Sequence, residues 1–326
     1  MIATAQKVLH YSLQPNLTLG QLKKATTFCG DTEEAQQLAE RMEAHHIVGI
    51  TSEMENYPPK CYEIKRAPYL LYAMGNLALL DQKILGIVGP REMSSYAERV
   101  METFFVQAQG IALTTISGMA RGVDHKCHQL SLHYGIPTIA VLGGGLRWYL
   151  RSSAKSFIEK IVAEGGLVLS EFKLDFEPTT WSFPQRNRLI AGLSEVLFLP
   201  EARAGSGSLI TVDFALQMHR EVFVAPNQLF SVNGGGSNQL LAEGKATLLS
   251  NFEQLLSKFQ KNLTPSVSIP SIPDNLTSTE QELFSLVRKF SGKHLSEWEV
   301  SSRDFATLLS ELTLLELKGS IRQESP

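Results

Sequence analysis

Side chains suited to holding an anion gather in residues 182–211, SFPQRNRLIAGLSEVLFLPEARAGSGSLIT. Arg186 and Arg188 flank Asn187, and an apolar run separates them from a Gly-Ser-Gly-Ser loop at 205–208. A guanidinium group matches phosphate bidentately, and glycine lets a backbone approach a ligand closely. The fold itself needs only the apolar strand, so the arginines and the loop indicate that this segment holds something anionic.

The same residue types recur after other apolar runs of the chain. Arg91 follows Gly89-Pro90, and Arg121 lies in a second glycine turn at 117–122. Taken singly, each arginine fits a surface ion pair better; taken together, four arginines beside glycine turns favour phosphate binding. The candidate phosphate-binding residues are Gly89, Arg91, Ser117, Gly118, Arg121, Gly122, Arg186, Asn187, Arg188, Gly205, Ser206, Gly207 and Ser208.

Other chemistries find less support in the sequence. The first apolar run is followed by GPREMS instead of a G-x-G-x-x-G fingerprint, and no Walker A sequence occurs, so neither a dinucleotide nor a nucleotide-hydrolysis site is predicted. His125 and His128 share a helix face, but no further ligand lies at metal-binding spacing nearby, which favours a structural histidine. Ser206 and Ser208 are not in a G-x-S-x-G elbow, so we expect hydrogen-bond donors there and no nucleophile. We predict no cofactor and no metal.

Aromatic and basic side chains are interleaved between residues 147 and 157, as Arg147, Trp148, Tyr149, Arg151, Lys155 and Phe157. Single-stranded nucleic acid is bound by this combination, because bases stack on rings while phosphates pair with cations. For each ring alone, packing within a helix is an equally good interpretation.

The elements that position these residues belong to one α/β domain. Continuous Val/Ile/Leu-rich runs at 84–89, 111–118, 138–145, 166–172, 195–202 and 221–227 alternate with amphipathic helical segments. Such runs are typical of strands buried on both faces of a parallel sheet, so we predict a doubly wound, Rossmann-like sheet. Ligands of such sheets bind outside the carboxyl ends of the strands, where the candidate residues cluster.

Smaller regions flank this domain. We predict a helical N-terminal region at 1–65, the Rossmann-like domain at 66–260, a Pro-rich linker at 261–276 and a small helical domain at 277–326.

Composition narrows the class of protein. The 326 residues carry a formal charge of −3, which argues against a broadly basic, duplex-coating protein but leaves room for a local basic groove. Three scattered cysteines form no disulfide framework, and neither a signal peptide nor a membrane-length apolar run occurs. We therefore expect a cytoplasmic protein.

The succession IVGPR, SGMARGVDHKCHQLSL, PTIAVLGGGL, LVLSEF, FPQRNRLIAGLSEVLFLPEARAGSGSLIT and VFVAPN…GGGSNQLLAEGKA closely resembles the DNA-processing protein A (DprA/Smf) family from about Tyr57 to Ala246. The resemblance implies an extended Rossmann fold without dinucleotide cofactor or known catalysis. It implies that the protein binds single-stranded DNA, forms a homodimer and loads the RecA recombinase onto DNA taken up in natural transformation. It further implies that Arg186 and Arg188 line a phosphate pocket, and that the C-terminal domain is a winged helix.

Two departures from the family pattern affect the expected site. Pro90 stands where the family commonly has a serine, so one hydroxyl and one N–H are lost beside Arg91. The loop after the glycine cluster also lacks the family's usual residues, and Arg151 and Lys155 are expected to supply its charge.

A competing interpretation is a nucleotide-hydrolysing enzyme of the lysine-decarboxylase-like phosphoribohydrolases, which share a related core. Aligning their P-G-G-x-G-T-x-x-E loop on Gly207 puts Thr211 where the catalytic glutamate is needed. Without that carboxylate, no side chain is left at that position for general acid–base catalysis of glycosidic-bond cleavage. The sequence therefore favours a binding protein over an enzyme.

Overall fold

The computed structural model describes residues 32–260 and residue 283 of the chain. The contacts divide the chain into a unit of residues 1–261 and a second unit of residues 262–326. The predicted linker, the winged helix and most of the predicted N-terminal helices lie outside the described residues.

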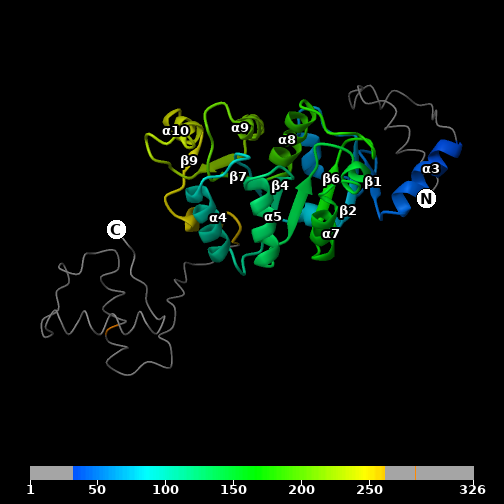
Figure 1. The fold of residues 1–326 in the computed structure, drawn as a ribbon, viewed down its shortest axis with the longest axis horizontal. Coiled ribbons are helices and arrows are strands. Elements are labelled where there is room, and N and C mark those ends of the chain that lie inside the picture. The colour runs from blue at the N-terminus through cyan, green and yellow to red at the C-terminus, as the bar shows by residue number, and fades with distance from the viewer. Residues whose placement is uncertain (1–31, 261–282, 284–326) are drawn as a thin grey trace, which may run out of the picture. The chain divides into compact units, whose positions relative to one another are not determined.

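One nine-stranded sheet forms the centre of the described unit (Figure 1), in the order β1-β2-β6-β5-β4-β3-β7-β8-β9. The strands are β1 Val48–Thr51, β2 Leu70–Gly75, β3 Ile84–Ile87, β4 Thr114–Gly118, β5 Thr138–Val141, β6 Leu167–Ser170, β7 Val196–Leu199, β8 Glu221–Val224 and β9 Thr247–Leu248. All pairs from β6 through β9 are parallel. The predicted doubly wound α/β fold is thereby confirmed, and each of the six predicted apolar runs contains a strand.

Two strands at one side of the sheet differ from the parallel expectation. β1 pairs antiparallel with β2, and β2 pairs antiparallel with β6. β1 lies inside the range 1–65 that the sequence assigned to a separate helical region, yet its pairing makes it part of the main sheet. The helix α3, Thr32–Glu43, precedes it.

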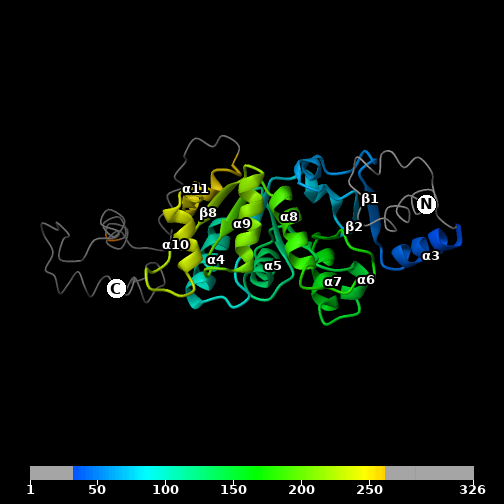
Figure 2. The same cartoon turned by 90° about the horizontal axis from the view of Figure 1, so that it is seen from above.

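Helices cover both faces of the sheet because successive strand residues point to opposite sides. Leu197 and Leu199 of β7 pack in the core that includes α8 and α9, whereas Val196 and Phe198 pack in the core that includes α4 and α5. Figures 1 and 2 show α8, α9 and α10 on one face and α4, α5 and α7 on the other. The helices are α4 Ser95–Gln107, α5 Val123–His133, α6 Leu146–Tyr149, α7 Lys155–Ala163, α8 Ser182–Leu193, α9 Gly207–Gln217, α10 Gly235–Ala242 and α11 Phe252–Leu256, with short 3-10 helices η1 Pro59–Glu63 and η2 Leu77–Asp81.

None of the helices within residues 32–260 combines the length and the apolar character that crossing a bilayer requires.

Candidate functional site

The candidate loops meet where the strand order of the sheet reverses. From β3, the strands β4 to β6 follow on one side, and the later strands β7 to β9 follow on the other side. The loops that leave the carboxyl ends of β3, β4 and β7 therefore border one crevice, the usual ligand position in such sheets.

Arg91 follows β3 and is the best-placed cation of this crevice. Its side chain is exposed, and its guanidinium carbon lies 5.4 Å from the centre of the Phe183 ring. Phe183 itself packs so closely on Gly143 that a Cβ there would lie 2.7 Å from the ring. Within residues 32–260, neither Arg91 nor the exposed Arg121 forms an ion pair, so both keep their donors for a ligand.

The glycine turn after β4 is built around the backbone next to Arg91. Gly122 has a φ of +80°, and a Cβ there would lie 2.3 Å from the Pro90 carbonyl oxygen. The Val123 N–H donates to the same carbonyl at 3.2 Å, and Val123 packs against Gly89. The two glycines thus allow the close contact that fixes the backbone carrying Arg91.

Arg186 lies beneath this turn instead of in the open crevice. Its side chain is 3% exposed and donates to the Val141 carbonyl and, at 3.1 Å from Nε, to the Asn187 side-chain oxygen. A Cβ at Gly118 would lie 2.4 Å from the Asp124 carboxylate and 2.5 Å from the Arg186 guanidinium, so only glycine fits between them. Arg186 therefore lies below the glycine turn and bridges the ends of β4 and β5.

Asp124 is the buried carboxylate that faces Arg186. Burial raises its pKa, and Arg186 together with hydrogen bonds from Ser117 and the Ala120 backbone opposes that rise. Ser117 is fully buried, and its hydroxyl lies 2.6 Å from the Ile87 carbonyl oxygen, so its one proton faces two acceptors inside the protein. The hydroxyl of Ser117, expected to contact phosphate, is thus engaged inside the protein.

Arg188 is not brought to the same place as Arg186. Its Nη2 donates to the Glu171 carboxylate at 2.5 Å, and both side chains are 8% exposed. Burial raises the pKa of Glu171, with Arg188 opposing the rise. This ion pair joins α8 to the end of β6, away from the turn after β4.

The Gly-Ser-Gly-Ser loop begins helix α9 at the same edge. Ser206 caps the helix by accepting the Ser208 N–H at 3.4 Å, and the two hydroxyls lie 2.8 Å apart. Gly205 has a φ of +73°, and no atom lies within 4 Å of a Cβ built at Gly205 or Gly207. The two glycines are exposed, whereas Ser208 is buried with 7% of its surface accessible. The loop therefore presents the backbone of its glycines at a helix N-terminus, which favours an anion.

Arg151 and Lys155 lie at the far side of the site, where α6 leads into α7. Arg151 shares the Asp175 carboxylate with Arg147, at 2.6 and 2.7 Å. Lys155 is 3.7 Å from Glu159 on the next helical turn. Both candidate cations are 57% exposed and partly balanced by carboxylates.

All three aromatic residues near Arg151 have packing roles, and Trp148 packs against the core beside Tyr149, with ring centres 5.1 Å apart. Tyr149 is 9% exposed, and the Phe157 ring lies 4.3 Å from the ring of His125. His128 is fully buried, between the Gly118 carbonyl at 2.7 Å and the Thr138 hydroxyl at 2.8 Å. Because a carbonyl only accepts, Nε2 of His128 carries the proton and supports the glycine turn of the site.

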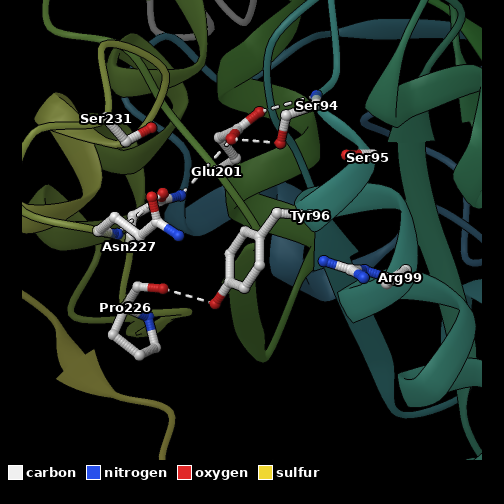
Figure 3. A pocket seen from close by; sticks show the side chains of 9 residues that line it. Ser94, Ser95, Tyr96, Arg99, Glu201, Pro226, Asn227 and Ser231 are labelled. Atoms are coloured by element: carbon white, nitrogen blue, oxygen red, sulfur yellow. Dashed lines mark hydrogen bonds between the residues drawn. The ribbon is translucent and has the colours of Figure 1, made fainter. Parts of the chain in front are cut away.

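A pocket of about 540 Å³ adjoins the crevice on the β7–β8 side (Figure 3). Glu201, 1% exposed, accepts the Ser94 N–H at 3.1 Å and the Ser94 hydroxyl at 2.7 Å, and Asn227 at 3.5 Å. Tyr96 donates to the Pro226 carbonyl at 2.5 Å across the pocket. The sequence predicted no binding role for Glu201, Asp124 or Phe183. Glu201 stands at the carboxyl end of a predicted strand, together with the candidate loops. Phe183 lies three residues before Arg186, on the same helix face.

Comparisons with known proteins agree on one family. The family model for DNA recombination-mediator protein A matches residues 49–260. Protein Smf of Escherichia coli (strain K12) is 33% identical over 262 residues, which span 80% of this chain and 68% of that protein. DNA processing protein DprA of Streptococcus pneumoniae is 35% identical over 204 residues, spanning 63% of this chain and 71% of that protein.

Solved structures agree with the sequence comparison. The structure of DNA processing protein A from Streptococcus pneumoniae matches with a TM-score of 0.62 at 29% identity, covering 80% of this chain and 96% of that one. DNA processing protein A from Helicobacter pylori, solved to explain how that protein binds single-stranded DNA, matches with a TM-score of 0.58 at 29% identity and covers 66% and 96%.

Proposed function

The chain belongs to the DNA recombination-mediator protein A family, and we propose that it binds single-stranded DNA along the carboxyl ends of its strands. The observation that carries the proposal is Arg91, an exposed guanidinium supported by the Phe183 ring and unpaired with any carboxylate of residues 32–260. A cation and an aromatic side chain side by side suit the phosphate and the base of a nucleotide.

The remaining loops extend this contact into a groove for the DNA backbone. Glu92, next to Arg91, reaches Arg203 at 3.7 Å, so the β3 and β7 loops lie close together. The exposed Gly205 and Gly207 and the exposed Arg121 then add phosphate contacts on either side. Arg186 faces the buried Asp124 and supports the glycine turn from below, whereas Arg188 is paired with Glu171 away from the groove.

We propose binding rather than catalysis, and the burial of the two side chains nearest to a catalytic position supports this. Thr211, aligned with the catalytic glutamate of the phosphoribohydrolases, is 1% exposed on α9. Glu201 is similarly buried and accepts three hydrogen bonds, so it has little surface to offer a substrate. We propose that the protein releases no free base from nucleoside monophosphates, and an assay that detects such release contradicts this part.

The wider role follows from the family. We propose that the protein forms a homodimer, hands single-stranded DNA to the RecA recombinase during transformation or recombination, and acts in the cytoplasm. A pull-down of RecA with the full chain, and light scattering of the full chain, test the two partners separately.

Fluorescence anisotropy with single- and double-stranded oligonucleotides over a salt series tests the DNA-binding proposal. We expect tighter binding of the single strand, and an affinity that falls steeply with salt because phosphate contacts release counterions. Arg91→Ala should weaken binding by about 1.5–3 kcal/mol, the usual contribution of a hydrogen bond to a charged group.

Arg41→Ala is the matched control, since Arg41 is an exposed arginine on α3, which leads into the amino end of β1. Circular dichroism must show both variants folded. Equal affinity for duplex and single strand, or an Arg91→Ala variant that binds like the parent protein, overturns the proposal.

A further inference from the structure

We propose that Trp181 is a base-stacking residue for the single-stranded DNA, and that it extends the groove beyond Arg91. This inference rests on the proposed function and adds a contact that the phosphate-binding residues do not supply. Trp181 is 54% exposed, although tryptophan is a residue type that proteins usually bury to a large extent. It directly precedes α8, the helix that carries Phe183 and Arg186.

The position of Trp181 is on the same edge of the sheet as Arg91. Ser182, the next residue, donates from its hydroxyl to the Gly143 carbonyl at 2.5 Å, just beyond the carboxyl end of β5. Phe183 packs on Gly143 and supports the Arg91 guanidinium. A DNA strand whose phosphate contacts Arg91 is therefore placed to pass the N-terminal end of α8, next to Trp181.

Two neighbouring rings hold the indole in a fixed orientation. The Trp181 ring makes edge contacts with Phe172 at 5.9 Å and with Phe176 at 5.6 Å, measured between ring centres. Phe172 and Phe176 stack on each other at 4.9 Å. A ring that is already held loses little conformational freedom when a base stacks on it, so the contact favours binding more than a free side chain would.

Cations flank this aromatic cluster. Asp175, the neighbour of Phe176 in the chain, is shared by Arg147 and Arg151. Two guanidinium groups on one carboxylate leave a net positive charge, and Arg151 is 57% exposed. An exposed ring beside excess positive charge is the arrangement that takes single-stranded nucleic acid without regard to sequence.

Intrinsic fluorescence tests the contact directly, because the chain has three tryptophans. In a Trp148→Phe/Trp298→Phe double variant, Trp181 is the remaining tryptophan, and excitation at wavelengths that tyrosine does not absorb isolates its emission. We expect oligo(dT) to quench its emission in proportion to the bound fraction measured by anisotropy. In Trp181→Phe, we expect the oligonucleotide to bind with little change of the emission of the other two tryptophans.

Affinity gives the second readout. Trp181→Ala should weaken oligo(dT) binding by about 5- to 150-fold, the range for loss of one base–aromatic stack, and Trp181→Phe should weaken it less because a ring remains. Tyr62→Ala is the matched control: Tyr62 is 51% exposed, and its 3-10 helix lies at the opposite edge, where Lys60 contacts Glu195 just before β7. Its affinity should equal that of the parent protein.

The outcomes separate this inference from the proposed function. If the parent protein does not bind oligo(dT), the proposed function fails. If the parent binds, Arg91→Ala weakens binding, and Trp181 shows neither quenching nor an effect of Trp181→Ala, the inference is overturned while the proposed function stands. If Trp181→Ala does not fold, the quenching of Trp181 and the affinity of Trp181→Phe still decide.

Discussion

Removing one partner of the buried Arg188–Glu171 ion pair should destabilise the protein far more than removing both. An isolated buried charge keeps its desolvation penalty, so breaking such a pair typically costs about 3–5 kcal/mol, whereas an apolar pair of similar volume is often neutral or stabilising by about 1–4 kcal/mol. The variants are Arg188→Met, Glu171→Leu and the double variant.

The structure ranks the two single variants. A Glu171 left alone can take up a proton, because burial already raises its pKa, and this limits the loss to about 3 kcal/mol. An Arg188 left alone stays charged, so Glu171→Leu should approach about 5 kcal/mol. Within the described residues, one oxygen of Glu171 and one Nη of Arg188 are buried without a hydrogen-bond partner. One Arg188–Glu171 hydrogen bond, with a further hydrogen bond from Gln185 to Glu171, therefore offsets two desolvation penalties, which favours the double variant.

Equilibrium unfolding in urea, followed by circular dichroism on the full chain, measures these differences. The loss of stability caused by Arg188→Met should also become smaller as the pH falls toward the raised pKa of Glu171, because a protonated, neutral carboxyl is buried at a lower cost than a carboxylate. The double variant should bind single-stranded DNA like the parent protein. A double variant less stable than both single variants, or an Arg188→Met variant less stable than Glu171→Leu, refutes the reasoning.

Three further predictions concern a buried histidine, a glycine turn and two buried cysteines. Burial lowers the pKa of His128 from 6.5 to about 4, so the unfolded chain binds a proton at a higher pH than the folded chain does. The free energy of unfolding should therefore fall by up to about 3 kcal/mol as the pH drops from 6.5 to 4. Urea unfolding across that range should show a smaller fall for His128→Gln. Gly122→Ala should destabilise the protein by about 1–3 kcal/mol and weaken DNA binding in titrations, whereas Gly110→Ala, with a similar φ of +75° but no atom within 4 Å, should lose stability alone. Burial raises the pKa of Cys61 to about 12 and also raises the pKa of Cys127, so neither thiol forms the reactive thiolate readily. Mass spectrometry should find both cysteines unmodified by iodoacetamide in the native protein and alkylated in urea. Rapid labelling of the native protein contradicts the structure.

The parallel part of the sheet could be predicted because strands buried on both faces leave continuous apolar runs, and their order along the chain implies helical crossovers. The antiparallel β1 and β2 could not, because a four-residue strand such as β1 carries no sign of the direction in which it pairs. The position of Arg91 followed from the strand that precedes it.

Arg186 and Arg188 show where the prediction of the site failed to separate roles. Residues two positions apart on a helix point to nearly opposite sides, since each residue turns the helix by about 100°. The two side chains accordingly reach different partners, Asp124 and Glu171. The sequence also could not predict that Ser117 is buried, because a serine at the end of a strand can hydrogen-bond either to a ligand or to a neighbouring backbone carbonyl.

The pairing of β3 with both β4 and β7 has a consequence for the nascent chain. β3 through β6 leave the ribosome first and can form their pairs, whereas Leu85 must wait for its register partner Val196. Until β7 is made, one side of β3 is an open parallel edge, the kind of exposed backbone that promotes association with other chains. Pairings between distant residues also form slowly. Arg91 and the turn at Gly122 are thus synthesised well before the Gly-Ser-Gly-Ser loop, and the groove can be completed only after β7 and that loop have been made.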